Sequence, residues 1–209
     1  MSLASHLATG LDKLGLTLDV ETQQRLLDYV ALLHKWNKVY NLTAVREPQR
    51  MIYHHLLDSL VVFPHMAGRN IADVGSGAGL PGIPLALANP EWKITLLDSN
   101  HKKTVFLQQV CIELGLANVT VVCDRVEAWR PAEKFDVVIS RAFSDLGELA
   151  RLTAHLCAAD GVLMAMKGLY PNEELAQLSA EFVAEPIIPL QVPGLEAHRH
   201  LVTIKRSVQ

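Results

Sequence analysis

A glycine-rich segment that follows a short apolar run is the part of this sequence best suited to bind a small molecule. Ile71–Val74 leads directly into Gly75-Ser76-Gly77-Ala78-Gly79-Leu80-Pro81-Gly82. Glycines at alternate positions permit positive φ angles and a close approach of the backbone to a ligand, and Pro81 suits the first turn of a helix. The free N–H groups at such a helix start favour a polar or anionic ligand. The segment therefore predicts a nucleotide-cofactor site between a strand and a helix.

The glycine spacing fits two kinds of cofactor site. Gly77, Gly79 and Gly82 match the G-x-G-x-x-G pattern of dinucleotide enzymes, which would make the protein an NAD(P)-linked oxidoreductase. Counted from the strand end, the segment begins at Asp73 and reads Asp-Val-Gly-Ser-Gly-Ala-Gly, a form commoner in S-adenosylmethionine (SAM) methyltransferases. Asp73 either accepts hydrogen bonds from loop N–H groups or contacts the cofactor, and its position supports both roles equally.

Polar residues after the following strands favour SAM. Asp98 ends the next apolar run, where a carboxylate accepts hydrogen bonds from ribose hydroxyls in either class of enzyme. Cys123–Glu127 and Phe135–Ala142 lie at the third and fourth runs. A methyltransferase places these two segments at the adenine and at the methionine end of SAM, whereas a dehydrogenase has no use for the pair.

These segments must be positioned by an alternation of strands and helices. From residue 70 onward, strands are expected over Asn70–Val74, Ile94–Leu97, Val119–Val122, Val137–Ser140 and Val162–Met166, with helices from Pro81, over Asn100–Leu114 and near Asp145–Leu156. This pattern predicts an α/β, doubly wound, Rossmann-like fold with a parallel sheet. Phe182–Leu190 and His200–Ile204 are separated by Val192-Pro193-Gly194, which predicts two antiparallel C-terminal strands.

The N-terminal part has a helical period instead. Apolar residues three or four apart predict an amphipathic helix over about residues 21–37, starting near Asp19, and a second helix after Glu47-Pro48. We expect an N-terminal helical extension over residues 1–66 and a single compact SAM-binding domain over residues 67–209.

Two side-chain groups in this extension have more than one interpretation. Trp36 and Tyr40, four residues apart, favour core packing over RNA contact. His54, His55 and Asp58 fall at helical spacing, but no further matched ligand supports a metal site. We expect a hydrogen-bonded cluster that braces the helices against the cofactor loop.

The composition limits the classes of protein to consider. The 209 residues are half apolar and a fifth charged, which predicts a globular chain with a sizeable core. No apolar run approaches the length of a membrane span and no signal peptide is evident, so a cytoplasmic protein is expected. Three cysteines without metal-ligand spacing favour reduced thiols. A net charge of −3 argues against general electrostatic binding of nucleic acid, so any contact with RNA must be local.

Ordered segments along nearly the whole chain resemble the RsmG (GidB) family of ribosomal RNA small-subunit methyltransferases. The segments are Lys35–Thr43, His55–Ser59, the glycine segment, Leu97–Ser99, Arg125–Glu127, Ser140–Ala142, Lys167-Gly168 and Arg199–Val202. Ala78, where relatives often have proline, is a mild departure. The resemblance implies a SAM-dependent enzyme that methylates N7 of one guanine in bacterial 16S rRNA, at position 527 in the usual numbering of that RNA.

The resemblance also implies roles for individual residues. Gly75 and Leu80 would line the cofactor at the first loop, together with Gly77 and Gly79 of the same segment. The residues expected farther along the cofactor are Asp98 at the ribose, Val126 and Glu127 at the adenine, and Arg141 at the cofactor carboxylate. Asn41, Lys167 and Arg199 are candidate contacts to the RNA, and Lys167 is equally well explained as an exposed lysine at a strand end.

The implied reaction needs no general base. N7 of guanine carries no proton to remove, so positioning supplies much of the rate enhancement and no catalytic residue is expected. The expected partner is 16S rRNA within the 30S subunit, with no metal, no membrane and a monomer favoured. The alternatives are the NAD(P)-linked oxidoreductase and a non-catalytic ribosome-assembly factor that binds SAM as a ligand only.

Overall fold

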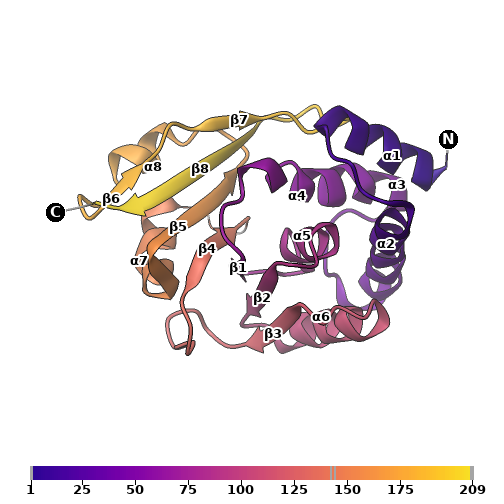
Figure 1. Ribbon diagram of the computed structural model, residues 1–209, viewed down its shortest axis with the longest axis horizontal. Coiled ribbons are helices and arrows are strands. Elements are labelled where there is room, and N and C mark those ends of the chain that lie inside the picture. The colour runs from indigo at the N-terminus through magenta and orange to yellow at the C-terminus, as the bar shows by residue number, and fades with distance from the viewer. Residues whose placement is uncertain (1, 142, 144, 208–209) are drawn as a thin grey trace.

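The computed structural model describes residues 2–141, 143 and 145–207, and within them a central eight-stranded sheet (Figure 1). The strand order is β3-β2-β1-β4-β5-β8-β6, with β7 paired to the other part of β8. The parallel strands are β1 (Asn70–Val74), β2 (Lys93–Asp98), β3 (Val119–Cys123), β4 (Phe135–Ser140) and β5 (Cys157–Lys167). All five were expected, and their carboxyl ends meet at one edge of the sheet.

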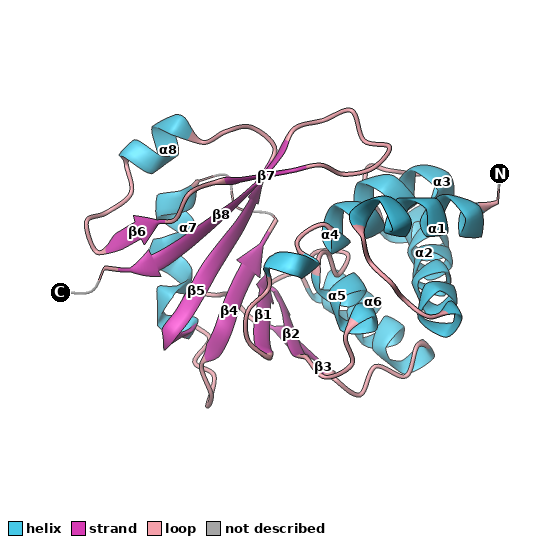
Figure 2. Cartoon of the chain, turned by 45° about the horizontal axis from the view of Figure 1, so that its top comes forward, coloured by secondary structure: helices cyan, strands magenta, loops and turns pink. Residues whose placement is uncertain are grey.

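Helices cover both faces of the sheet (Figure 2). Side chains alternate between the faces, because successive residues of a strand point in opposite directions. Ile71 belongs to a core shared with the N-terminal helices, α5 (Gly82–Ala88) and α6 (His101–Glu113). Ala72 belongs to a second core, covered by α7 (Leu146–Thr153), η3 (Ala154–Leu156) and α8 (Asn172–Ala176). The predicted doubly wound fold is confirmed.

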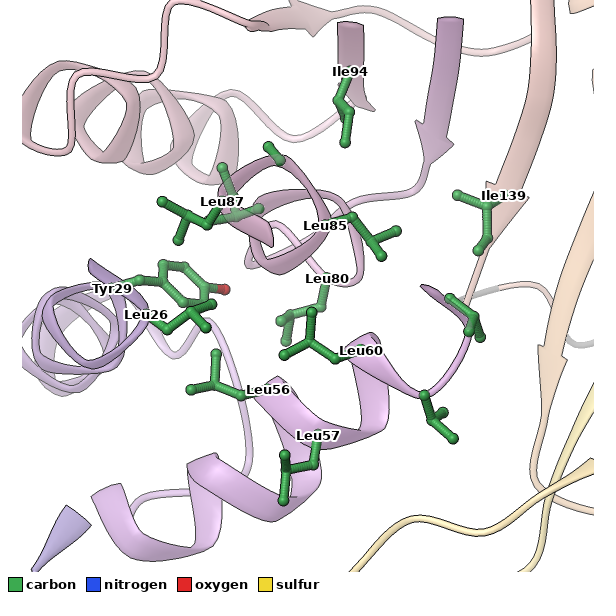
Figure 3. Close-up of a cluster of buried hydrophobic side chains, with 14 of the residues drawn as sticks. Leu26, Tyr29, Leu56, Leu57, Leu60, Leu80, Leu85, Leu87, Ile94 and Ile139 are labelled. Carbon is green, nitrogen blue, oxygen red and sulfur yellow. The ribbon is translucent and has the colours of Figure 1, made fainter. Parts of the chain in front are cut away.

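The N-terminal helices pack directly onto the sheet and its helices. They are α1 (Leu3–Leu14), α2 (Val20–Tyr40), α3 (Pro48–Met51), the π-helical η1 (Ile52–Leu57), α4 (Asp58–Leu60) and η2 (Phe63–His65). Asp19 begins α2 as predicted, and its side chain accepts a hydrogen bond from the Thr22 N–H at 2.6 Å. Figure 3 shows Tyr29 and Leu56 of the N-terminal helices gathered with Leu60 and Leu80 in one buried cluster. A domain boundary between residues 66 and 67 remains a prediction.

The consecutive elements α3, η1 and α4 carry the second predicted helix. The π-helical turn is a rare geometry that is frequent at functional sites. It contains His54 and His55, and Asp58 follows it directly. These residues lie close to the carboxyl edge of the sheet, as their contacts with Arg141 show.

Three features differ from the prediction. α1 and α8 were not expected. The single strand predicted over Phe182–Leu190 is wrong, because the chain forms two short strands, β6 (Phe182–Ala184) and β7 (Ile188–Leu190). Pro186 lies between them and has no N–H to continue a ladder. Both short strands pair antiparallel with β8 (Arg199–Arg206), as expected for the C-terminal part.

Candidate functional site

The glycine loop after β1 has the backbone that its sequence predicts. Gly75, Gly77 and Gly79 have φ angles of 72°, 58° and 92°, a region that side chains disfavour. At Gly77 an added Cβ would meet only the Gly75 carbonyl oxygen, at 3.8 Å, so this side of the loop is open to a ligand. At Gly79 and Gly82 an added Cβ would lie 2.5 Å from Ile83 and 2.2 Å from Leu96. These two glycines permit close packing, whereas Gly77 permits close approach.

Asp73 lies beneath this loop and braces it. Its Oδ2 accepts a hydrogen bond from the Gly82 N–H at 2.9 Å, which is the loop-fixing role expected for it. Its Oδ1 has no hydrogen-bond partner among the described residues, and the residue is fully buried. Burial raises the pKa of the carboxyl to about 7. An unpaired buried oxygen at this position suits a donor supplied by a bound cofactor, so the direct contact remains a prediction.

Replacing Asp73 by asparagine is expected to change the pH dependence of stability in the cofactor-free protein. The pKa of about 7 lies above the ordinary value of 3.8, so the protonated form stabilises the fold and this stabilisation is lost as pH rises toward 7. The amide oxygen of D73N would still accept from the Gly82 N–H, but the amide does not titrate. The melting temperature of D73N relative to that of the wild type should therefore be higher at pH 8 than at pH 5. A constant difference would contradict the prediction.

A pocket of about 310 Å³ opens beside the glycine loop at the carboxyl edge of the sheet. It brings together four of the predicted cofactor residues: Gly75, Asp98, Val126 and Glu127. Other residues lining it, which were not predicted to bind the cofactor, include Ser99, Lys103, Arg125 and Phe143. They follow the ends of β2, β3 and β4, the strand ends that bind ligands in doubly wound folds. The other predicted cofactor residues are not among those lining the pocket: Asp73, Gly77, Gly79, Leu80 and Arg141. Ala142 lies outside the described part of the chain.

Asp98 has the geometry to hold a ribose. Its Oδ2 accepts from the Gly77 N–H at 2.9 Å and its Oδ1 from the Asn100 N–H at 2.8 Å. Lys103 Nζ lies 3.7 Å from Oδ2. Each carboxylate oxygen can accept a second hydrogen bond, so vicinal hydroxyl groups can still bind. The pocket and the open side of Gly77 together fit a nucleoside with a polar tail.

Arg141 and Arg199 are joined by a single buried carboxylate. Asp58 accepts from Arg199 Nε at 2.7 Å through Oδ1 and from Arg141 Nη1 at 3.0 Å through Oδ2, and its side chain is 3% exposed. Arg141 also donates to the His54 carbonyl oxygen. Arg141 directly follows β4, and Arg199 begins β8. Two guanidinium groups and one carboxylate leave net positive charge at this edge, which suits an anionic group.

His55 belongs to the same cluster and is neutral. Its Nδ1 lies 2.9 Å from the His54 carbonyl, which can only accept, so Nδ1 carries the proton and Nε2 accepts from the Thr43 hydroxyl at 2.9 Å. Burial and the Arg141 charge lower the pKa of His55 to about 4. A hydrogen-bonded cluster is present as expected, but among the described residues Asp58 connects it to Arg141 after β4 and to Arg199 of β8; bracing of the cofactor loop itself remains a prediction.

The candidate RNA contacts lie in different environments. Asn41 is exposed at the end of α2, with a φ angle of 50°. Lys167 is paired with Glu174 at 2.8 Å and its side chain is 11% exposed, so the exposed lysine proposed as its alternative role is wrong. Trp36 packs 5.6 Å from Phe106 as expected for a core residue, but Tyr40 stacks on Trp36 and remains 43% exposed. Only Arg199 of the three candidates joins the Arg141 cluster.

Residues 2–141, 143 and 145–207 were searched for metal-binding groups and for membrane-spanning helices. No group of three or more His, Cys, Asp or Glu side chains is placed to hold a metal ion there. The same residues contain no helix long and apolar enough to cross a membrane.

The sequence matches one protein family and is similar to known members of it. The profile of the family described as rRNA small subunit methyltransferase G (GidB) matches residues 22–202. The Ribosomal RNA small subunit methyltransferase G of Nitrosospira multiformis is 56% identical over 216 residues, covering 100% of both chains. That of Laribacter hongkongensis is 57% identical over 204 residues, covering 98% of this chain and 99% of its own.

Solved structures share the fold at low sequence identity. The mitomycin 7-O-methyltransferase MmcR has a TM-score of 0.64 at 17% identity, covering 85% of this chain and 60% of its own. The glycopeptide N-methyltransferase MtfA, solved in complex with SAM, has a TM-score of 0.63 at 10% identity, covering 74% of this chain and 88% of its own. At such identities the likeness concerns the fold alone.

Proposed function

The chain belongs to the rRNA small subunit methyltransferase G (GidB) family, and on this premise we propose that it transfers the methyl group of SAM to guanine N7 in 16S rRNA. The observation that carries the proposal is the pocket beside the open glycine loop, with Asp98 at its wall and the Arg141–Asp58–Arg199 cluster at the same edge of the sheet. Family membership decides against the oxidoreductase interpretation of Gly77, Gly79 and Gly82.

SAM supplies a methyl group made electrophilic by its sulfonium. Bound SAM would supply this methyl group to the N7 lone pair of guanine, with the electrons of the broken carbon–sulfur bond left on sulfur and the positive charge moved to the guanine. No proton would need to be transferred. The protein therefore needs to align the two reactants and exclude competing water.

The described residues divide this work between them. Asp98 would hold the ribose hydroxyls of bound SAM, Val126 and Glu127 would hold its adenine, and Arg141 would pair with the carboxylate of its methionine end. Asp73 Oδ1 would be the acceptor for a donor of the cofactor. His55 is buried and neutral, so it adds no positive charge to the cluster of Arg141 and Arg199.

Arg141→Ala is expected to weaken SAM binding by about tenfold to a hundredfold, because a charge-assisted hydrogen bond contributes about 1.5–3 kcal/mol. Equilibrium titration of SAM by calorimetry measures the change. Arg69→Ala is a suitable control, because Arg69 is exposed and directly precedes β1, at the amino edge of the sheet, away from the pocket. Equal SAM dissociation constants for the wild type and R141A would contradict the assignment of Arg141.

The substrate is proposed to be the guanine at a non-helical position of the assembled small subunit. N7 lies in the major groove, which is too deep and narrow in A-form RNA for an enzyme to reach, so the base must be in a loop or flipped out. With a net charge of −3, the protein needs a shaped ribonucleoprotein surface for part of its recognition. We further propose that it acts as a monomer in the cytoplasm, where ribosomes assemble.

Transfer of labelled methyl from SAM tests the function. The substrates are 30S subunits lacking the modification and naked 16S rRNA in parallel, and mass spectrometry places the methyl group. Label on one guanine N7, with a preference for subunits, is the expected result. SAM binding without transfer to either substrate would favour the non-catalytic assembly factor.

A further inference from the structure

Two tyrosine rings are exposed in the described part of the chain, and they differ in their surroundings. Tyr40 is 43% exposed and stacks on Trp36 at 5.2 Å. Tyr170 is 51% exposed, and its ring makes an edge contact with His200 at 5.5 Å. Leu169, next to it, is 78% exposed. Large apolar side chains this exposed at one position are candidates for contact with a partner.

The loop that carries Leu169 and Tyr170 lies beside Arg199. It follows β5 at the carboxyl edge, where Lys167 pairs with His200 of β8. A Cβ added to Gly168 would lie 3.9 Å from Arg199 Nη1. Arg199 in turn shares Asp58 with Arg141. The loop that carries the exposed ring therefore lies beside the cationic cluster, while the ring itself contacts His200, which follows Arg199 in β8.

The charge at this position suits a phosphate. Lys167 is neutralised by Glu174, whereas Arg141 and Arg199 share one carboxylate. Within the described residues, the guanidinium of Arg199 donates through Nε to Asp58 and through Nη1 to the His198 carbonyl. Its Nη2 group is left to donate to an oxygen of a ligand, and phosphate oxygens match this geometry.

We propose that Leu169 and Tyr170 form a stacking platform for a base of the single-stranded rRNA loop that carries the target guanine, with Arg199 on an adjoining phosphate. The inference rests on the proposed function, because a guanine whose N7 is to be methylated must leave its stack. An aromatic ring that replaces the lost stacking is how proteins commonly hold such unstacked bases. Of the two exposed tyrosines, Tyr170 is the one carried by the loop beside Arg199.

Tyr170→Ala tests the platform. We expect its KM for 30S subunits to rise by on the order of tenfold, the effect of losing one base–aromatic stack. Its SAM dissociation constant and melting temperature should match those of the wild type. The slope of RNA affinity against salt should also stay unchanged, because stacking releases no counterions. Tyr170→Phe keeps the ring and should keep the wild-type KM.

Ile112→Ala is the matched control. Ile112 is 74% exposed near the end of α6, at the opposite edge of the sheet, and its loss should not change the KM. A wild-type KM for Y170A, or an equal rise for Y170A and Y170F, would overturn the platform while leaving the methyltransferase function intact. If the wild type transfers no methyl group, the proposed function fails instead. Fluorescence anisotropy with a labelled rRNA loop then tests the platform directly, and equal affinities of the wild type and Y170A would overturn it.

Discussion

Asp58→Asn is expected to lower the free energy of unfolding by about 3 kcal/mol. Removing one partner of a buried ion pair costs about 3–5 kcal/mol, and the arginines here are about a quarter exposed, which places the loss at the lower end. The amide would retain one acceptor oxygen, and its NH₂ group would face a guanidinium. Arg141 would also lose its anchor, so SAM affinity should fall with stability.

Urea unfolding of D58N, R199Q and the double mutant measures this loss and assigns it. Because both single mutants break the same contact, the double mutant should lose less stability than the sum of the two. Asp28→Asn is the control, since Asp28 is exposed on α2 and accepts only from Gln24 among the described residues. Surface substitutions usually change the free energy of unfolding by no more than about 0.5 kcal/mol. A change this small for D58N would show that Asp58 does not hold the cluster together.

The sequence predicted the part of the structure that depends on local patterns. The runs that became β1 to β5 are apolar and bounded by turn residues, and Asn100 and Asp145 cap α6 and α7 at the expected starts. The positive φ angles of the glycine loop could also be predicted, because glycine is the residue type that adopts them readily. The fold class was therefore available before any tertiary contact was known.

Long-range contacts were beyond sequence reasoning. Asp58 and Arg199 are 141 positions apart, and only folding brings β8 beside α4. The same holds for Tyr170, whose loop lies beside Arg199 only in the folded chain.

The first helix, α1, could have been predicted from the sequence. Leu7 and Leu11, four residues apart, give a helical period, and Ser2 caps the helix.

The pairing of Lys167 also depends on tertiary structure. Glu174 belongs to α8, a five-residue helix whose period is too short to predict. Glu174 accepts from both Lys167 and the Leu146 N–H, so it joins the end of β5 to the start of α7. A phosphate contact by Lys167 would have to displace this carboxylate, which makes Arg199 the stronger candidate for the RNA backbone.

Gly77→Ala and Gly82→Ala are expected to damage the protein in different ways. A Cβ at Gly82 would lie 2.2 Å from Leu96 Cδ2 and 2.8 Å from Asp73 Oδ2, both buried, so G82A should lose about 3 kcal/mol of stability through overpacking. A Cβ at Gly77 meets open space but sits at a φ angle of 58°, which costs about 1–2 kcal/mol. G77A should therefore fold well.

The open space at Gly77 is where the cofactor is proposed to approach, so G77A should still lose SAM affinity by at least about tenfold, the equivalent of about 1.4 kcal/mol. Gly115→Ala separates backbone strain from ligand contact. Gly115 has a φ angle of 60° and no atom within 4 Å of an added Cβ, and it follows α6 at the opposite edge of the sheet. Urea unfolding should give similar losses for G77A and G115A, while SAM titration should separate them. G115A shares the backbone strain of G77A, so a difference in SAM affinity between the two reports contact with the cofactor. Wild-type SAM affinity in G77A would mean that the cofactor approaches the loop from another side.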